Sequence, residues 1–528
     1  MEEMYNKWPR HLINAVPVAG YGKRLSIFTI ALEGWRRGLD LKFYRLEDPE
    51  NKFKVRYTLS DGINEYNFES SKGSKITSEA DAICDDKYLT KKYLRQANVP
   101  VPDGEFFSEK STDDEIIKYV KKLGFPLVLK PTDANGGRGV FSNITSMSSF
   151  KRALNIVRNK LEFNNVIVEK HVEGEEYRVI VVDDKVVGVL NRVPANVKGD
   201  GVSSIRELVN MKNKERRNNP HLRSRRIKID DVSIAVLEKQ GYDLESVPEK
   251  GKTVNLRFTS NLSTGGDSVD LTDEVPQELK QIAINATKAI PGLITSGIDI
   301  IVNSDKEEYM VIEANTKPGL GGHLFPVIGK PRNIPKAMID LYFPKTKNKE
   351  VSNFHFNFDP IIEILKDKTT NEVKVTPCPT GKYYAREYIV SGDIQSVNYR
   401  AWIRNQAKKR SLYGFVRNLD DGKVKVVVAS QNNEKLAEFK KLCYKGPEKA
   451  IVDDIVENEY NYSLPLIFEI IRPIRRMKNL DMKQLTREKN FYLRKFTEIE
   501  NSRTWKATAV VRSINANIKN AMRRFKRK

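Results

Sequence analysis

The stretch from Val128 to Val140, VLKPTDANGGRGV, constrains the fold more than any other part of the sequence. An apolar run typical of a strand ends in Lys130, and a loop with three glycines follows. Because glycine lets the backbone approach a ligand and turn N–H groups toward it, such a loop suits a phosphate chain. It lacks the Gly-Lys-Ser/Thr end of a P-loop and the spacing of a dinucleotide fingerprint, so neither is indicated. Considered alone, the loop is also compatible with an ordinary glycine-rich turn between strands.

Length and composition indicate a soluble, multidomain protein. The chain has 528 residues, of which 39% are hydrophobic and 30% are charged, which is enough for several separate cores. The three cysteines (Cys84, Cys378 and Cys443) are far apart and form neither a disulfide framework nor a zinc knuckle. We find no signal-peptide core at the start and no apolar run long enough to span a bilayer. These features predict a cytoplasmic location.

The net charge of +22 is concentrated at the carboxyl end. Residues 461–528 contain 18 Lys and Arg against 5 Asp and Glu, so 13 of the 22 net charges lie in this tail. Residues 465–477 and 515–528 mix apolar and basic side chains, as do segments that lie on anionic membranes or bind polyanions. The alternative is a helical extension packed on the body with a solvated basic face. Aromatic residues are sparse and no nucleic-acid module is recognisable, so no specific nucleic-acid partner is predicted.

The pattern of strands and helices predicts five parts, of mixed α/β and α+β class. Residues 1–84 form a small α/β domain on the substrate side, with a helix over 25–37 and strands over 41–46 and 55–59. The basic stretch 212–228 is predicted to be a surface insertion. The complete division is 1–84, 85–345 with alternating helices and β-branched strands, a linker at 346–380, a compact domain at 381–460, and the basic helical tail at 461–528.

Three further elements complement the glycine loop with groups that suit a nucleotide and a metal ion. Residues 166–178 read as a strand, a hinge and a second strand, whose backbone can read an adenine edge while Glu176 accepts from ribose hydroxyls. Asp299 lies in an apolar strand, and Glu313 and Asn315 lie on one face of another because side chains repeat every two residues. Two carboxylates and an amide are hard oxygen donors of the kind that bind Mg²⁺. Each of these elements could instead have an ordinary structural role. Within apolar strands, however, burying a polar side chain without a partner costs free energy.

Residues 87–326 resemble the ATP-grasp ligases, in particular the ATP-grasp module of cyanophycin synthetase and of bifunctional glutathione synthetase. The resemblance is carried by ordered blocks at 128–140, 166–177, 191–201, 261–266 and 313–326. It implies an ATP-grasp fold and ATP with Mg²⁺ or Mn²⁺ as cofactors. The residues that match the cofactor-binding positions are Lys87, Lys130, Asn135, Gly136, Gly137, Arg138, Gly139, Glu169, Lys170, Val172 and Glu176; Asp299, Glu313 and Asn315 match the metal ligands. Arg178, Arg192 and Arg257 are candidates for holding the γ-phosphate or a substrate carboxylate.

The implied chemistry is phosphorylation of a carboxylate, followed by attack of an amine on the acyl-phosphate to give an amide. Such a reaction needs no side-chain nucleophile, so positioning and electrostatics carry the catalysis. The expected substrates are small-molecule, peptide or polymer carboxylates and amines. Neither their identity nor the oligomeric state follows from the sequence.

Residues 381–460 carry a second phosphate signature. The segment 390–400, VSGDIQSVNYR, precedes GFVRN at 414–418 and the pair Asp421-Gly422. This resembles acylphosphatase, with the split βαβ order of a ferredoxin-like fold. The resemblance makes Arg400 the phosphate-binding arginine and Asn418 the water-positioning asparagine. Two departures are Ser396 in place of a loop glycine and the acidic Asp393 beside it, so an inactive structural copy is the alternative.

The sequence as a whole favours an ATP-dependent carboxylate–amine ligase fused to a domain that hydrolyses or binds acyl-phosphates. One alternative is a nucleotide-binding assembly factor of a cell-surface polymer pathway, associated with the membrane through the tail. Another is an enzyme that acts mainly as an acyl-phosphate hydrolase.

Overall fold

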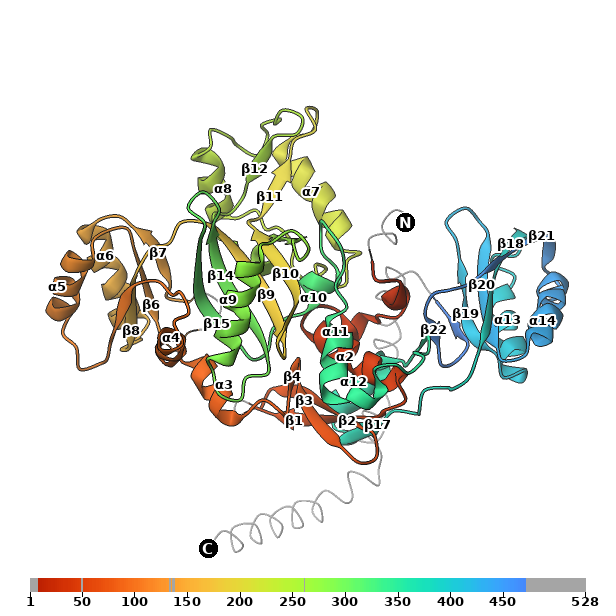
Figure 1. Ribbon diagram of the computed structural model, residues 1–528. Coiled ribbons are helices and arrows are strands. Elements are labelled where there is room, and N and C mark those ends of the chain that lie inside the picture. The colour runs from red at the N-terminus through yellow and green to blue at the C-terminus, as the bar shows by residue number, and fades with distance from the viewer. Residues whose placement is uncertain (1–7, 49–50, 133, 135–137, 261, 472–528) are drawn as a thin grey trace, which may run out of the picture. The chain divides into compact units, whose positions relative to one another are not determined.

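The computed structural model describes residues 8–48, 51–132, 134, 138–260 and 262–471. These form two compact units, one of residues up to Tyr383 together with 461–466, and one of residues 384–460 with the segment from Ile467. Figure 1 shows the helices and strands of both units. In the part of the chain that is described, no helix is both long and apolar enough to cross a membrane.

The N-terminal part of the first unit is an antiparallel sheet covered by helices. Its strands run in the order β17 (Glu372–Lys374), β1 (Asp40–Glu47), β2 (Phe53–Ser60), β3 (Glu65–Glu69) and β4 (Lys72–Gly73). The helix α2 (Leu25–Arg36) is buried along its whole length. Its buried Arg36 donates to the carbonyls of Phe354 at 2.6 Å and His11 at 2.9 Å. The expected helix and the first two strands are therefore confirmed within one residue or two.

The structure corrects the predicted linker at 346–380. This segment contains β16 (Phe354–His355), α12 (Phe358–Lys366) and β17, which pairs with β1. Phe354, Phe356 and Phe358 are at most 1% exposed. The aromatic side chains fold back onto α2 and β1, with ring centroids of Phe28 and Phe356 5.3 Å apart. The segment is therefore part of the core of the first domain.

A four-stranded sheet carries the glycine loop. The strand order is β5 (Gly104–Phe107), β8 (Val166–Lys170), β6 (Leu127–Pro131) and β7 (Phe141–Ile144). The alternating residues Leu127, Leu129, Val166 and Val168 form a core with α5 (Asp113–Leu123) and α6 (Met147–Asn155). The intervening Lys130 and Glu169 consequently belong to the opposite face of the sheet.

The adjoining five-stranded antiparallel sheet carries the acidic residues. Its order is β13 (Asp267–Asp270), β10 (Lys185–Val193), β9 (Glu175–Val182), β14 (Thr295–Asn303) and β15 (Glu308–Asn315). One face packs against α9 (Gln277–Lys288), which lies across the sheet in Figure 1. Buried Ile298, Ile300 and Val311 belong to that core, so Asp299 and its neighbours line the other face.

The basic insertion is only partly a surface segment. It includes the end of α7 (Ile205–Arg216), and α7 packs with α8 (Asp231–Glu238), β11 (Asn196–Lys198) and β12 (Thr253–Asn255) around a small core. Residues 219–222 are buried, and the Asn219 amide donates to the Phe325 carbonyl at 3.2 Å. The segment was predicted to be an insertion on the surface, and only its surface position is corrected, because residues 219–222 close against residues 320–325.

The second unit has the expected order of strand, helix, strand, strand, helix and strand. These are β18 (Tyr384–Asp393), α13 (Tyr399–Lys409), β19 (Tyr413–Asn418), β20 (Val424–Ser430), α14 (Asn433–Lys445) and β21 (Ile451–Glu459). Its antiparallel sheet is extended by β23 (Glu469–Ile470), which pairs in parallel with β19. The described start of the predicted helical tail, 461–471, thus holds β23 and β22 (Leu464–Pro465), whereas 472–528 lie outside the described residues.

Candidate active site

The glycine loop connects β6 to β7. Of its predicted ligand-binding residues, Asn135, Gly136 and Gly137 lie outside the described residues. Gly139 has φ +72°, a conformation that favours glycine. Lys87, the first residue of α4 (Lys87–Gln96), donates from Nζ to the Ala134 carbonyl at 2.9 Å. This lysine therefore lies directly against the loop.

Two lysines and one glutamate form a buried charge cluster next to the loop. Glu169 is 2% exposed and forms ion pairs with Lys130 and, at 2.5 Å, with Lys91. Burial raises the pKa of Glu169, but the two ammonium groups outweigh it and hold that pKa below its usual value. Burial lowers the pKa of Lys91 to about 8, against the pull of Glu169. We assigned no role to Lys91 from the sequence. Its position four residues after Lys87 on one helix, which puts both lysines on the same face, was the pattern that could have indicated one.

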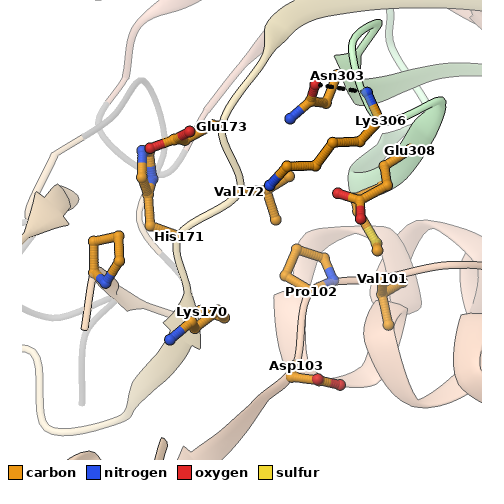
Figure 2. Close-up of a pocket in the computed structure, with 12 residues that line it drawn as sticks. Val101, Pro102, Asp103, Lys170, His171, Val172, Glu173, Asn303, Lys306 and Glu308 are labelled. Atoms are coloured by element: carbon orange, nitrogen blue, oxygen red, sulfur yellow. Dashed lines mark hydrogen bonds between the residues drawn. The ribbon is translucent and has the colours of Figure 1, made fainter. Parts of the chain in front are cut away.

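The hinge between β8 and β9 borders a cavity of about 370 Å³. Figure 2 shows Lys170, His171, Val172 and Glu173 on one side, and Asn303, Lys306 and Glu308 on the other. The backbone N–H groups of Lys170 and His171 are bonded to Asp103 and Pro126. The N–H of Val172 makes no hydrogen bond within the described residues, so it can donate to a ligand. Of the residues predicted to bind the nucleotide, Lys170 and Val172 line this cavity, whereas Lys130, Glu169 and Glu176 do not.

Arginines and carboxylates form a closed network on the five-stranded sheet. Asp299, 2% exposed, accepts from Arg178 Nε and, at 2.7 Å, from Arg178 Nη2. Arg192 pairs with Glu176 and reaches the same Asp299 carboxylate at 3.5 Å. Burial raises the pKa of Glu176, and the nearby Asp299 adds to this shift while Arg192 opposes it. The structure thus brings together four of the residues predicted from the sequence.

The candidate metal ligands lie on adjacent strands. Asp299 is the cross-strand partner of Glu313, and Gly297 is the partner of Asn315. The Asn315 amide nitrogen donates to the Gly297 carbonyl at 3.4 Å, which leaves its oxygen for a ligand. No group of three or more His, Cys, Asp and Glu suited to a metal occurs among the described residues. Two carboxylates and an amide fit Mg²⁺ shared with substrate phosphates.

Arg257 is not joined to this network. It is 7% exposed, and its Nη2 donates to the two carboxylate oxygens of Asp230, at 2.8 and 2.7 Å, and to the Lys228 carbonyl at 3.5 Å. Asp230 caps α8 in the small insertion core. None of the described contacts connects Arg257 with Arg178 or Arg192.

The second unit holds its own candidate site. Arg400 lies in the first turn of α13, after a loop in which Ser396 and Asn398 have φ +67° and +63°. Asn418 donates from Nδ2 to Gln395 Oε1 at 3.0 Å, and Gln395 is in turn held by the Gly422 carbonyl at 2.7 Å. The buried Oδ1 of Asn418 has no hydrogen-bond partner among the described residues. We assigned no role to Gln395 from the sequence, and no spacing signal identified it.

Comparison with known proteins identifies two domain families. Residues 84–209 and 232–327 match the model of the RimK-like ATP-grasp domain, and residues 386–470 match that of acylphosphatase. Cyanophycin synthetase from Trichormus variabilis is 36% identical over 300 residues, which cover 56% of this chain and 33% of that protein. The bifunctional glutathione biosynthesis protein of Clostridium perfringens is 33% identical over 332 residues, covering 60% and 41%.

Among solved structures, a bifunctional glutathione synthetase from Pasteurella multocida is 33% identical, with a TM-score of 0.44 and coverage of 55% of this chain and 41% of that one. The chain thus spans well under half the length of these relatives.

Proposed function

We propose that this chain, which carries a RimK-like ATP-grasp domain followed by an acylphosphatase domain, joins a carboxylate to an amine at the expense of ATP. The observation that carries the proposal is the arrangement on the five-stranded sheet. Asp299 and Glu313 are cross-strand partners, and Arg178 and Arg192 both contact the Asp299 carboxylate. Phosphoryl transfer to a carboxylate requires carboxylates that bind a cation, placed next to arginines that bind anionic groups.

The reaction proceeds in two steps. A carboxylate oxygen attacks the γ-phosphorus, the bond from that phosphorus to the β–γ bridging oxygen breaks, and ADP leaves. The amine nitrogen then attacks the acyl carbon, the phosphate leaves with the bonding electron pair, and the nitrogen loses its proton to solvent.

Individual side chains bind and orient the reactants in this proposal. Lys87 and Lys130 hold the phosphate chain, Val172 N–H binds the base, and Glu176 accepts from ribose. Arg178 and Arg192 exchange a carboxylate partner for the γ-phosphate or the substrate carboxylate, since a guanidinium binds either in a bidentate manner. Asp299, Glu313 and Asn315 would hold Mg²⁺, which would neutralise part of the charge on the phosphates.

The second unit is proposed to hydrolyse acyl-phosphates. Arg400 binds the phosphate, and the unpaired Oδ1 of Asn418 orients the attacking water while Gln395 fixes its amide. Ser396 adopts the positive φ that the loop requires despite having a side chain. A chain with both activities can remove an acyl-phosphate that meets no amine.

Hydroxylamine traps the first intermediate as a hydroxamate and provides the test. We expect ATP-dependent hydroxamate and ADP with at least one member of a panel of carboxylates. ATP binding without ADP from any carboxylate overturns the ligase proposal and favours a nucleotide-driven assembly factor.

For the second unit, Arg400→Ala is expected to abolish hydrolysis of benzoyl phosphate without changing hydroxamate formation. An unchanged rate of hydrolysis in this variant refutes the hydrolase proposal and favours a structural copy.

A further inference from the structure

Two lysines share Glu169 in the buried charge cluster, but they are held differently. Lys91 on α4 pairs with Glu169 Oε2 at 2.5 Å, and the same ammonium group donates to the Pro102 carbonyl at 3.3 Å. The Lys130 ammonium group on β6 pairs with Glu169 Oε1 and has no further hydrogen bond or ion pair among the described residues. Lys91 is therefore fixed at two points, whereas Lys130 is held by Glu169 alone.

The cluster contains one cation more than its carboxylate compensates. All three residues are buried, since Glu169 is 2%, Lys91 5% and Lys130 8% exposed. Burial lowers the pKa of Lys91 to about 8, the like charge of Lys130 adds to this lowering, and Glu169 opposes it. The attraction of one carboxylate is therefore divided between two ammonium groups.

Transfer of Lys130 to a phosphate chain changes this balance. In the proposed function Lys130 holds the phosphates of ATP, and an ammonium group that turns to a phosphate oxygen gives up contact with Glu169. A buried carboxylate that loses its cation is strongly destabilised, because a desolvated charge is left without compensation. Lys91 is the other cation that contacts Glu169 in the described part of the chain, so it is the group that can provide this compensation.

The position of Lys91 on α4 relates it to the glycine loop. The helix begins at Lys87, and the Asp86 side chain caps its first turn by accepting from two backbone N–H groups. Lys87 donates to the Ala134 carbonyl at 2.9 Å, and Lys91 follows one turn later on the same face of the helix. One helix therefore contributes a lysine to the loop and a second lysine to Glu169.

From these contacts we propose that Lys91 is a positioning residue that holds Glu169 while Lys130 turns to the phosphate chain of ATP. The inference rests on the proposed binding of ATP at Lys130. Lys91 acts through Glu169 and touches neither the nucleotide nor the reacting carboxylate. In a chain without Lys91, Glu169 keeps Lys130 as its one cation and competes with the phosphates for it.

This exchange of partners has a proton signature. Departure of Lys130 removes a like charge that lowers the pKa of Lys91 and leaves Glu169 to Lys91 alone, so that pKa rises when ATP binds. Lys91 lines a cavity of about 270 Å³, through which it exchanges a proton with solvent; the charged residues beside it there are Lys92, Arg95 and Glu105. At pH 8 about half of the ligand-free chains lack the Lys91 proton, so ATP binding takes up about half a proton and weakens as the pH rises further.

The test is calorimetric titration of the full chain with ATP and Mg²⁺ at pH 8, without a carboxylate substrate. Comparing two buffers of different ionisation enthalpy, Hepes and Tris, counts the protons taken up on binding. Relative to wild type, Lys91→Met should bind ATP about tenfold more weakly and take up about half a proton less. Lys92→Met removes an exposed charge from the same helix and should match wild type in both measurements.

Two further variants separate this role from a merely structural one. Lys91→Arg keeps the charge and should recover most of the ATP affinity, but without the proton uptake, because arginine does not titrate at this pH. Lys91→Met/Glu169→Gln should bind ATP no more weakly than Glu169→Gln alone, because Lys91 acts through Glu169. Affinity or proton uptake that is unchanged in Lys91→Met overturns the inference, as does an additive loss in the double variant.

Failure of the ligase proposal is distinguishable from failure of this inference, because the titrations need no turnover. When no carboxylate yields hydroxamate, ATP binding and its proton count still test Lys91. When hydroxamate forms, Lys91→Met should raise the KM for ATP about tenfold and leave kcat within about twofold. A fall in kcat of the same size as the rise in KM places Lys91 on the reacting groups and overturns the positioning role.

Discussion

Replacing Glu169 by glutamine is predicted to destabilise the ATP-grasp domain and weaken ATP binding together. Glu169 is 2% exposed and compensates two lysines, one of them at 2.5 Å. At an effective dielectric constant of about 20, unit charges at this separation attract by about 7 kcal/mol before the cost of desolvation. Removing one partner of a buried pair costs about 3–5 kcal/mol, because the remaining charge stays buried without compensation. Here two lysines lose the same partner.

Urea unfolding measures this loss, with Glu105→Gln on the neighbouring strand β5 as the matched control. Glu105 is exposed, so its replacement should change the free energy of unfolding by less than about 0.5 kcal/mol. In Glu169→Gln the pKa of Lys91 falls further below about 8, because Glu169 is the group that raises it. Calorimetric titration should therefore also show at least a tenfold weaker ATP affinity. A Glu169→Gln chain within 1 kcal/mol of wild type would refute the assignment of a buried, charge-compensating glutamate.

Three further predictions follow from the same contacts. Between pH 8 and 10.5 the unfolded chain keeps a proton on Lys91 that the folded chain has lost, so the free energy of unfolding should rise with pH. Urea unfolding at both pH values should show a rise in wild type that exceeds the rise in Lys91→Met by about 3 kcal/mol. Asp299→Asn should lower ATP-dependent hydroxamate formation at least about 100-fold, and EDTA should abolish it in wild type with recovery on adding Mg²⁺ or Mn²⁺; full activity in either case contradicts the assigned ligands. Gln395→Ala should lower kcat for acyl-phosphate hydrolysis about tenfold with little change in KM. A rise in KM of about tenfold would indicate a role in substrate binding instead.

Period-two alternation explains why much of the site could be predicted from the sequence. Glu313 and Asn315 were expected on one face of a strand, and the register places them opposite Asp299 and Gly297 in the neighbouring strand. On β8 the same alternation puts Val166 and Val168 on the face that packs in the core and Glu169 on the opposite face. Local patterns such as these depend on the strand alone and survive folding.

Contacts between distant segments could not be predicted in this way. Aromatic residues at 354, 356 and 358 lie among charges and prolines, so the segment reads as a linker although it packs onto α2. The pairing of Arg257 with Asp230 uses residues 27 positions apart that no motif connects. Residues 219–222 are buried, and Asn219 among them donates to the carbonyl of Phe325, 106 positions further along the chain. In each case a tertiary contact decided the outcome over the local composition.

The charges of the active site itself nearly cancel, which has a consequence for substrate capture. Five cations belong to the predicted ATP site and its neighbours, and four carboxylates lie among them: Lys87, Lys91, Lys130, Arg178 and Arg192 against Glu169, Glu176, Asp299 and Glu313. A nearly neutral, paired network exerts little attraction beyond a Debye length of about 8–10 Å. Long-range attraction of an anionic substrate must therefore come from charge outside this network. The paired network therefore acts at short range, on a substrate that has already reached the site.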